Sequence, residues 1–245
     1  SIRRQRQMCI RDSLGIWVIS PKRLFTNNWK DELWLVAGGI FGGSLYFFTE
    51  NTALGITQAS NVSYIICTAP LLTTILSLLF YKSEKASKGL IYGSLLALMG
   101  VGLIVFNGSF VLKISPIGDL LTLLAALSWA FYSLIIKKMA GRYPTVFITR
   151  KIFFYGVLTI LPAFLLHPLH PDTVVLLQPA VLFNLLFLAV LASLICYVLW
   201  NVVLKQLGTV RASNYIYLNP LVTMIASFLI LDEKITLVAL GGAAC

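Results

Sequence analysis

Seven long runs of apolar residues, separated by shorter polar stretches, set the pattern of this sequence. They cover residues 33–54, 61–81, 89–107, 118–136, 146–166, 181–204 and 212–231. An α-helix needs about 20 apolar residues to cross the roughly 30 Å hydrocarbon core of a bilayer, and each run has about that length. Residues 14–20 and 235–245 look like the end of an earlier run and the beginning of a later one. The pattern predicts an all-α polytopic membrane protein.

Two of these runs, with the residues that precede them, carry the same sequence pattern at a constant offset. Residues 51–79 and 201–229 align without a gap, and each has a Pro-Leu pair in the middle of its run. The matching polar and proline residues are Asn51 with Asn201, Ser63 with Ser213, Pro70 with Pro220, Thr73 with Thr223, and Ser77 with Ser227. A duplicated unit with a broken helix in each copy is typical of membrane transporters built from structural repeats.

Basic residues divide the connections between the runs into two classes. Among residues 14–245, thirteen lie on one side of the alternating connections, and only Lys113 and Lys234 lie on the other. By the positive-inside rule the first side is cytoplasmic, which places the 137–145 connection inside and the 167–180 connection outside. Five runs separate equivalent positions of the duplicated pattern, and an odd number reverses the direction of the chain. The two halves are therefore expected to be inverted in the membrane.

Composition strengthens the membrane assignment and argues against a nucleic-acid partner. The chain is 58% hydrophobic and 11% charged, whereas soluble domains carry about 25% charged residues. Its formal net charge is +10, but residues 3–13 (RRQRQMCIRDS) back-translate into a sequencing adapter. Residues 1–13 are therefore expected to be a non-native scar, without which the net charge is +7. The four cysteines form no disulfide framework.

The order and duplication of the motifs resemble the EamA-type permeases of the drug/metabolite transporter superfamily. In each half, acidic residues and a glycine-rich run follow the Pro-Leu pair, and residues 118–132 look like the opening of a second EamA unit. These acidic and glycine residues are Glu84, Gly93, Gly100 and Gly102, then Asp232, Glu233, Gly241 and Gly242. The resemblance implies an inverted repeat of five plus five transmembrane helices, with residues 14–112 and 113–245 as the two EamA repeats.

The same resemblance has consequences for the ends of the chain and for its location. The chain is expected to be truncated at both ends, lacking the first span, most of the second and much of the tenth. Both termini of the family are cytoplasmic, which agrees with the charges of the connections. A multi-pass protein of the cell (plasma) membrane is implied, in the inner membrane of a bacterium.

The two proline-containing runs are the first candidates for function. At helical spacing Ser63, Pro70 and Thr73 fall on one face, and their counterparts Ser213, Pro220 and Thr223 do the same. Proline donates no backbone hydrogen bond, so carbonyl groups near Ile66 and Ile216 lose their usual partner close to the bilayer centre. These faces either pack against each other or line a solute cavity.

Glu50 is the only acidic residue well inside a complete run. An ionisable residue in a membrane is a functional hypothesis by default. At helical spacing it shares a face with Gly39, Gly43 and Tyr46, and its counterpart in the second half is Trp200. Three interpretations remain open: an outer gate or proton-linked group, a structural ion pair, and a solvated residue at the rim.

Other side chains have the chemistry to contact a small polar solute by stacking or amide hydrogen bonds. They are Asn51, Trp129, Tyr132, Trp200, Asn201, Asn214 and Tyr217. Tyrosine and tryptophan near the ends of spans also form the interfacial aromatic belt, which is the alternative for the aromatic members. Arg150 and Lys151 either anchor the cytoplasmic end of their span or recognise an anionic solute. His167 and His170 have no further ligands nearby in the sequence, so no metal site is predicted.

The leading hypothesis is a secondary transporter that exports a small metabolite or drug-like solute by alternating access. No G-x-x-x-x-G-K-[ST] loop is present, and neither H-E-x-x-H nor G-x-S-x-G occurs. A non-transporting membrane scaffold is the alternative, and a membrane-embedded enzyme is less favoured. The expected partners are a small-molecule solute and the lipid bilayer, with proton coupling and a homodimer as further expectations. No cofactor is expected.

Overall fold

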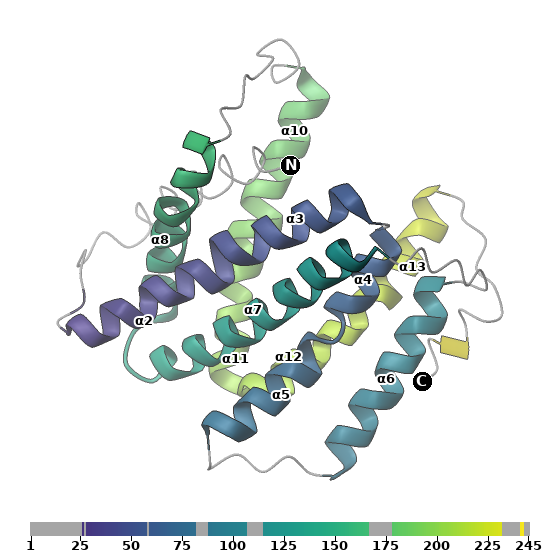
Figure 1. Ribbon diagram of the computed structural model, residues 1–245, viewed down its shortest axis with the longest axis horizontal. Helices are drawn as coiled ribbons and strands as arrows, with labels where there is room; N and C mark the ends of the chain where they lie inside the picture. Colours follow the sequence, from purple (N-terminus) through teal and green to yellow (C-terminus); the bar gives the residue numbers. More distant parts are fainter. Residues whose placement is uncertain are drawn as a thin grey trace. The chain divides into compact units, whose positions relative to one another are not determined.

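The computed structural model describes residues 26, 28–57, 59–81, 88–106, 115–166, 178–231 and 241–242, and every regular element there is helical (Figure 1). The predictions for residues 1–25, for the histidines at 167 and 170, and for residues 232–240 lie outside the described residues. In chain order the elements are α2 (Trp29–Gly39), η1 (Ile40–Leu45), α3 (Tyr46–Ile56), α4 (Ala59–Ile66), α5 (Ala69–Phe80), α6 (Lys88–Phe106), α7 (Pro116–Ala140), α8 (Thr145–Leu166), α10 (Pro179–Phe187), η2 (Leu188–Ile195), α11 (Cys196–Leu207), α12 (Thr209–Asn214), η3 (Tyr215–Tyr217) and α13 (Leu218–Leu231).

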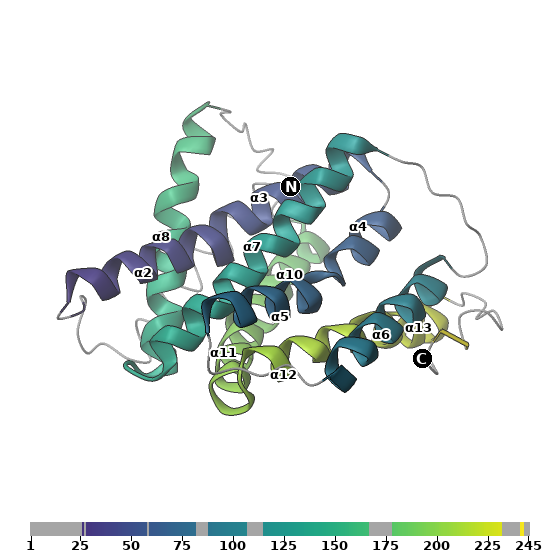
Figure 2. The same ribbon diagram turned by 60° about the horizontal axis from the view of Figure 1, so that its bottom comes forward.

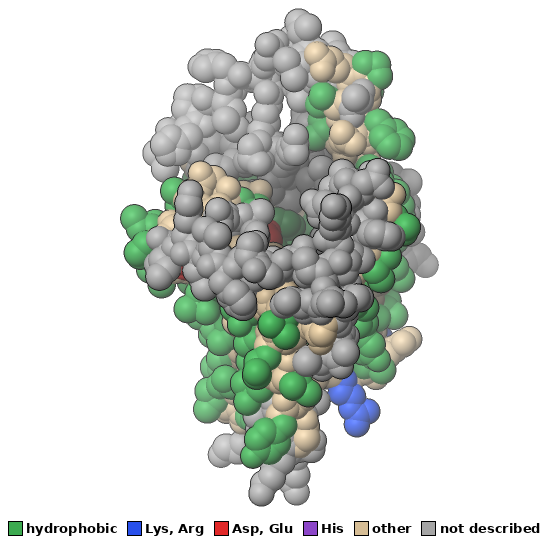
Figure 3. All heavy atoms as spheres, turned by 90° about the vertical axis from the view of Figure 1, so that its right-hand side faces the viewer, with side chains coloured by type: hydrophobic (Ala, Val, Ile, Leu, Met, Phe, Trp, Pro, Cys, Tyr) green, Lys and Arg blue, Asp and Glu red, His purple; other side chains and the backbone are tan. Residues whose placement is uncertain are grey.

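Each of the seven predicted spans coincides with one helical stretch of the described residues. Four of these stretches are long and apolar enough to cross a membrane: Asn61–Phe80, Pro116–Ala140, Thr145–Pro162 and Val181–Leu207. Large apolar side chains are exposed on them, as for Leu79, Phe183 and Leu199. Figure 3 shows hydrophobic side chains over most of the described surface on one face, as expected for a surface that contacts lipid. The prediction of an all-α polytopic membrane protein is confirmed.

The chain forms two compact units, and each combines segments from both predicted repeats. The first unit consists of Ser1–Phe48 and Phe131–Gly208, and the second consists of Thr49–Ala130 and Thr209–Cys245. We describe each unit separately.

In the first unit α2 and η1 pack against α8, and α11 packs on α8 as well (Figure 1). Glycines set how closely the first pair approaches. A Cβ atom on Gly39 would lie 2.6 Å from Tyr155 Cβ, and one on Gly43 would lie 3.1 Å from Gly156 Cα. Small residues of this kind let transmembrane helices pack backbone against backbone.

In the second unit α5 packs against α12, and α6 packs against α4 and α13. Figures 1 and 2 both show α13 beside α6. A Cβ atom on Gly102 of α6 would lie 3.1 Å from the ring of Tyr64 on α4. The Ser94 hydroxyl of α6 donates a hydrogen bond to Asn214 Oδ1 at 3.4 Å. The proline helices of the two predicted repeats thus share one packed unit.

Two kinds of interruption break the helices, and each kind occurs at equivalent positions of the two halves. A turn at Cys67 and Thr68 separates α4 from α5, and the 3-10 segment η3 separates α12 from α13. Both interruptions precede the matching prolines, Pro70 and Pro220, which confirms the predicted broken helices. The π-helical segments η1 and η2 form the second pair, because η2 includes residues 190–195, the counterparts of residues 40–45.

Candidate functional site

At the first proline interruption threonine hydroxyl groups add to the backbone hydrogen bonds. The amide of Thr68 donates to the Ile65 carbonyl at 2.9 Å, and its hydroxyl donates to the same oxygen at 2.6 Å. One turn later, the Thr74 hydroxyl donates to the Pro70 carbonyl at 2.9 Å. The sequence predicted carbonyl groups here without their usual helical partner, and protein hydroxyls now serve two of the carbonyls around the break.

The proline faces are buried in part. Pro70 and Thr73 are buried on α5, and Ser213 and Pro220 are buried on α12 and α13. In the second unit α5 packs against α12, and the choice between packing and cavity lining stays a prediction. Ser63 is exposed instead. The turn at residues 67–68 breaks the helical register, so Ser63 does not share the buried face that an uninterrupted helix predicts.

The remaining candidates in the second unit lie at different depths. Asn214 accepts the Ser94 hydrogen bond, and Tyr217 is half-buried in η3. Glu50 and Asn51 are half-buried on α3, as is Trp129 on α7. The side chain of Thr223 lies outside the described residues. None of these facts tests a role in solute binding, which stays a prediction.

Two predicted candidates meet in the first unit. The Tyr132 hydroxyl on α7 donates to Asn201 Oδ1 on α11 at 2.8 Å. The Asn201 amide in turn donates to Thr149 Oγ1 on α8 at 2.8 Å. Tyr132 and Thr149 are 0% exposed and Asn201 is 1% exposed. This chain of hydrogen bonds connects three helices inside an apolar unit. Trp200, the neighbour of Asn201, is half-buried on α11.

The first π-helical segment contacts the same cluster. The Tyr197 hydroxyl on α11 donates to the Gly42 carbonyl in η1 at 2.7 Å. The ring of Tyr197 lies 6.0 Å from that of Tyr132 and 5.1 Å from that of Phe153. A Cβ atom on Gly42 would lie only 2.2 Å from Tyr132 Cδ2, so only glycine fits there. A π turn departs from the i to i−4 pattern of hydrogen bonds, and here Tyr197 binds one of its carbonyls.

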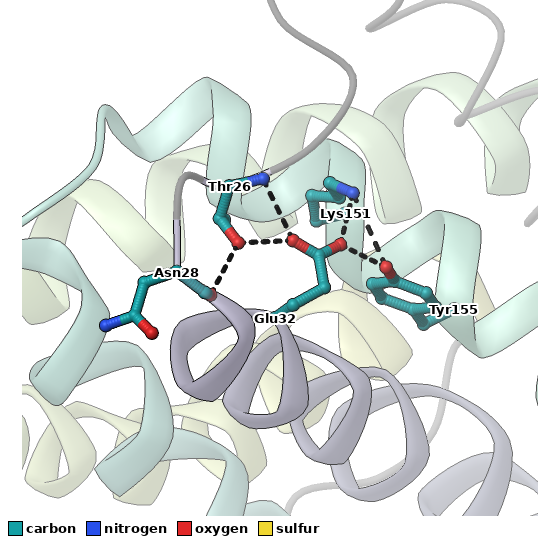
Figure 4. A network of polar contacts seen from close by, with 5 residues as sticks. All are labelled: Thr26, Asn28, Glu32, Lys151 and Tyr155. Atoms are coloured by element: carbon teal, nitrogen blue, oxygen red, sulfur yellow. Dashed lines mark hydrogen bonds and ion pairs between the residues drawn. The ribbon is translucent and has the colours of Figure 1, made fainter.

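A charged cluster that sequence reasoning missed lies at the beginning of α2 (Figure 4). Lys151 and Tyr155 reach from α8 toward Glu32, and both donate to Glu32 Oε1. The amide and hydroxyl of Thr26 donate to the other carboxylate oxygen at 3.0 and 2.5 Å. Glu32 is 7% exposed and Lys151 is 3% exposed. The ammonium group of Lys151 is therefore buried against Glu32, and its expected role at the cytoplasmic end of its span stays a prediction.

The neighbouring acid, Asp31, has a parallel set of partners. Arg142 Nη1 donates to Asp31 Oδ1 at 2.6 Å, and the Tyr143 hydroxyl donates to Oδ2 at 2.9 Å. Each of the two adjacent carboxylates therefore binds one basic side chain and one tyrosine. The sequence signal that could have indicated this cluster is the pair of acids that follows Asn28. The side chain of Asn28 caps α2 by accepting a hydrogen bond from the Lys30 amide, and the two acids lie in the first turn of that helix. A helix N-terminus stabilises such acids.

Glu32 precedes the predicted span, and its surroundings favour the ionised form of its carboxyl group. Burial by itself would raise the pKa of its carboxyl, but hydrogen bonds from Lys151, Thr26 and Tyr155 outweigh burial and lower the pKa to about 2. The carboxylate therefore stays ionised throughout the physiological pH range. Within the part of the chain that the structure describes, no three His, Cys, Asp or Glu side chains gather as metal ligands.

Comparison with known proteins gives one family. The model of the EamA-like transporter family matches residues 13–106 and 116–245. An uncharacterized transporter of Archaeoglobus fulgidus is 29% identical over 224 residues, which covers 90% of this chain and 75% of the relative. A probable amino-acid metabolite efflux pump of Salmonella typhimurium is 28% identical over 174 residues, covering 67% of this chain and 57% of the pump.

A solved crystal structure of another protein shares the fold. Its TM-score is 0.79 at 17% sequence identity, and the match covers 99% of this chain and 82% of the other. At this identity the likeness concerns the fold alone. The family and the named relatives are membrane transporters rather than enzymes, in agreement with the prediction from the sequence.

Proposed function

Because the chain belongs to the EamA-like transporter family of multi-pass membrane proteins, we propose that it exports a small metabolite or drug-like solute by alternating access. In this proposal residues 14–112 and 113–245 act as the two inverted repeats. The name of the Salmonella relative, a probable amino-acid metabolite efflux pump, supports export and makes amino acids and their derivatives the first solutes to test.

The observation that carries the proposal is the pairing of the helix interruptions. A π-helical segment and a break before a proline occur in each half, at equivalent positions. Interrupted spans in both halves of a duplicated protein are a feature of transporters that change access by moving one part against the other. A membrane scaffold would not need the same two interruptions in each half.

We place the polar solute contacts among the candidates from the sequence. In the first unit Tyr132 and Asn201 are hydrogen-bonded to each other and buried, so a solute that reaches them exchanges this hydrogen bond for its own. The proline faces, with Thr73 and Ser213, and the half-buried Asn51, Trp129, Trp200, Asn214 and Tyr217 remain proposed contributors. Glu50 is the proposed proton-linked group.

Counterflow in proteoliposomes tests the proposal. Vesicles that contain the purified protein are preloaded with an unlabelled mixture of amino acids and derivatives, and uptake of each radiolabelled member is measured against protein-free vesicles. Accumulation of at least one member is expected. A thermal unfolding measurement shows whether the reconstituted protein is folded. If it is folded and no member of the mixture shows counterflow, the scaffold alternative is favoured.

The same vesicles test Glu50. A Glu50→Gln variant keeps the size of the side chain and deletes its charge, and we expect transport that no longer depends on external pH, because a proton-linked carboxylate is lost. Glu50→Asp is the matched control and keeps a pH-dependent rate. An unchanged pH profile in Glu50→Gln would remove the proton-linked role.

A further inference from the structure

We propose that the two ion pairs of Asp31 and Glu32 form a latch that holds the beginning of α2 against α8, and that this latch opens when the two helices separate at that end. The four side chains that make the latch are Asp31, Glu32, Arg142 and Lys151. All belong to the first unit. The basic residues place this end on the side of the membrane that is predicted to be cytoplasmic.

The geometry of the latch is that of two adjacent ties between the same two segments. Asp31 binds Arg142 in the turn that precedes α8, and Glu32 binds Lys151 in the second turn of α8. The two ties differ in their access to water. The side chain of Arg142 is 54% exposed, whereas that of Lys151 is 4% exposed. Water that enters from this end therefore reaches the outer pair first and the inner pair second.

Beyond the latch the two helices meet closely at glycines. An added Cβ on Gly39 would lie 2.6 Å from Tyr155 Cβ and 2.9 Å from the Gly156 backbone nitrogen, and one on Gly43 would lie 3.1 Å from Gly156 Cα. Further along, the Ser44 and Thr159 hydroxyls share one hydrogen bond of 2.8 Å. Glycine lets the two backbones approach closely, and among the described contacts the two ion pairs are the charged ties at this end of the helix pair.

The helix held by the latch leads directly into a segment that can change register. α2 continues without a gap into η1, and π-helical segments are rare turns that occur often at functional sites. A latch at one end and a π segment at the other give α2 the two parts that a moving element needs. A static contact would explain the ion pairs and the close glycine packing, but not the π segment that follows α2.

Hydration is the physical means of opening. A buried ion pair holds strongly while it is dry, and removing one partner leaves an uncompensated buried charge. Water weakens the attraction and solvates both charges separately, so the same pair releases once the end is wet. The hydrogen bonds from Lys151, Thr26 and Tyr155 lower the pKa of Glu32, which favours hydration over protonation as the means of opening.

The latch is tested by the accessibility of a cysteine beneath it, a measurement that needs no transported solute. Ile152 on α8 is 0% exposed, and it faces Gly38 of α2, whose added Cβ would lie 3.4 Å from its side chain. An Ile152→Cys reporter in a background without other cysteines is labelled by a membrane-impermeant maleimide in inside-out vesicles. We expect slow labelling in this parent. Glu32→Gln and Lys151→Gln each raise the rate several-fold.

Three further variants make the test decisive. The charge exchange Glu32→Lys with Lys151→Glu restores slow labelling, and Tyr155→Phe, which removes one hydroxyl from the Glu32 carboxylate, raises the rate less than Glu32→Gln. Lys205→Gln changes an exposed lysine on α11 and is the matched control with the parental rate. Thermal midpoints are measured on the same samples.

The outcomes distinguish a latch that opens from a static pair of ionic contacts that only stabilises the fold. Faster labelling in Tyr155→Phe at an unchanged thermal midpoint supports a latch that opens locally. Parental labelling in Glu32→Gln and in Tyr155→Phe, or a rise in labelling that only follows a fall in the thermal midpoint, would refute it. A charge exchange that stays fast would also refute it, because the two side chains would not act as a pair. Failure of the counterflow experiment leaves this result intact.

Discussion

Among the described glycines, Gly42 is the one where an added Cβ atom has the least space. Its carbonyl accepts from Tyr197, and the ring of Tyr132 occupies the position where a Cβ atom would be. Gly42→Ala is expected to displace that ring and to break the Tyr132 to Asn201 hydrogen bond. Overpacking of a well-packed site costs about 1–3 kcal/mol. The measurement is the thermal midpoint and the amount of inserted protein.

Gly93→Ala is the matched control for Gly42→Ala. Gly93 lies in α6, and apart from its own helix backbone and chain neighbours no atom of the described residues lies within 4 Å of an added Cβ. Alanine favours a helix interior by up to about 1 kcal/mol over glycine, so this variant is expected to keep or slightly raise the midpoint. Equal midpoints for the two variants would show that the ring of Tyr132 moves aside without cost.

The sequence identified individual candidate side chains better than it identified the residues to which they are hydrogen-bonded. Tyr132 and Asn201 follow from the sequence as polar side chains in apolar runs, but their hydrogen bond joins residues 69 positions apart. Glu32 was missed for a related reason. It lies just before an apolar run, where an acid is usually solvated, and its partner Lys151 is 119 positions away. Sequence spacing carries no information on which helices will pack.

At the scale of elements, the two prolines are expected to matter through the interruptions that precede them. Pro70→Ala and Pro220→Ala each restore a backbone donor and allow a continuous helix, so we expect lower transport at an equal amount of protein in the membrane. The assay is the counterflow rate divided by the amount of reconstituted protein.

Pro162→Ala is a suitable comparison for the two proline variants. Pro162 is exposed inside α8, which runs from Thr145 to Leu166 as one helix. Its substitution is expected to leave transport unchanged. Parental rates in both Pro70→Ala and Pro220→Ala would mean that the interruptions play no part in the transport cycle.

The bounds of the helices follow the hydropathy of the sequence only approximately. The run at 118–136 was expected to end before Lys137, but α7 continues to Ala140. Lysines at the end of a helix reach the interface with their long side chains, so loss of hydropathy does not end the helix. The π segments gave no signal, because their small and apolar residues also suit an α-helix.

At the scale of the whole molecule, the orientation follows from the distribution of basic residues. Gly141 lies in the exposed turn between α7 and α8, and Gln178 is exposed directly before α10. Single cysteines at these positions, in a background without other cysteines, are expected to differ in labelling by an impermeant reagent on intact cells. Gln178→Cys is labelled and Gly141→Cys is protected. The reverse result would invert the assigned topology.

The division into two units could not be read from the order of the motifs. The sequence indicates two consecutive halves, whereas each compact unit takes helices from both. The first unit, for example, joins the beginning of α2 to α8 through Glu32 and Lys151, one residue from each predicted repeat. Duplication in the sequence therefore identifies equivalent positions but does not identify which of them pack together.

The π segment η1 also changes how the helix around it must be numbered. A π turn holds more residues than an α turn, so the angular position of every side chain after Leu45 is offset from a wheel drawn with the α repeat of about 100° per residue. Such a wheel places Gly39 and Glu50 on one face. Gly39 precedes η1 and Glu50 follows it, so the offset changes the angle between their side chains. Deletion of one residue within 40–45 would remove the offset and leave a plain α-helix. The same deletion within α2 would rotate the side chains on one side of it relative to those on the other. A sequence alignment of relatives should therefore permit a one-residue gap at η1 and at its counterpart η2. Residues that lie on the same helix face would then stay aligned.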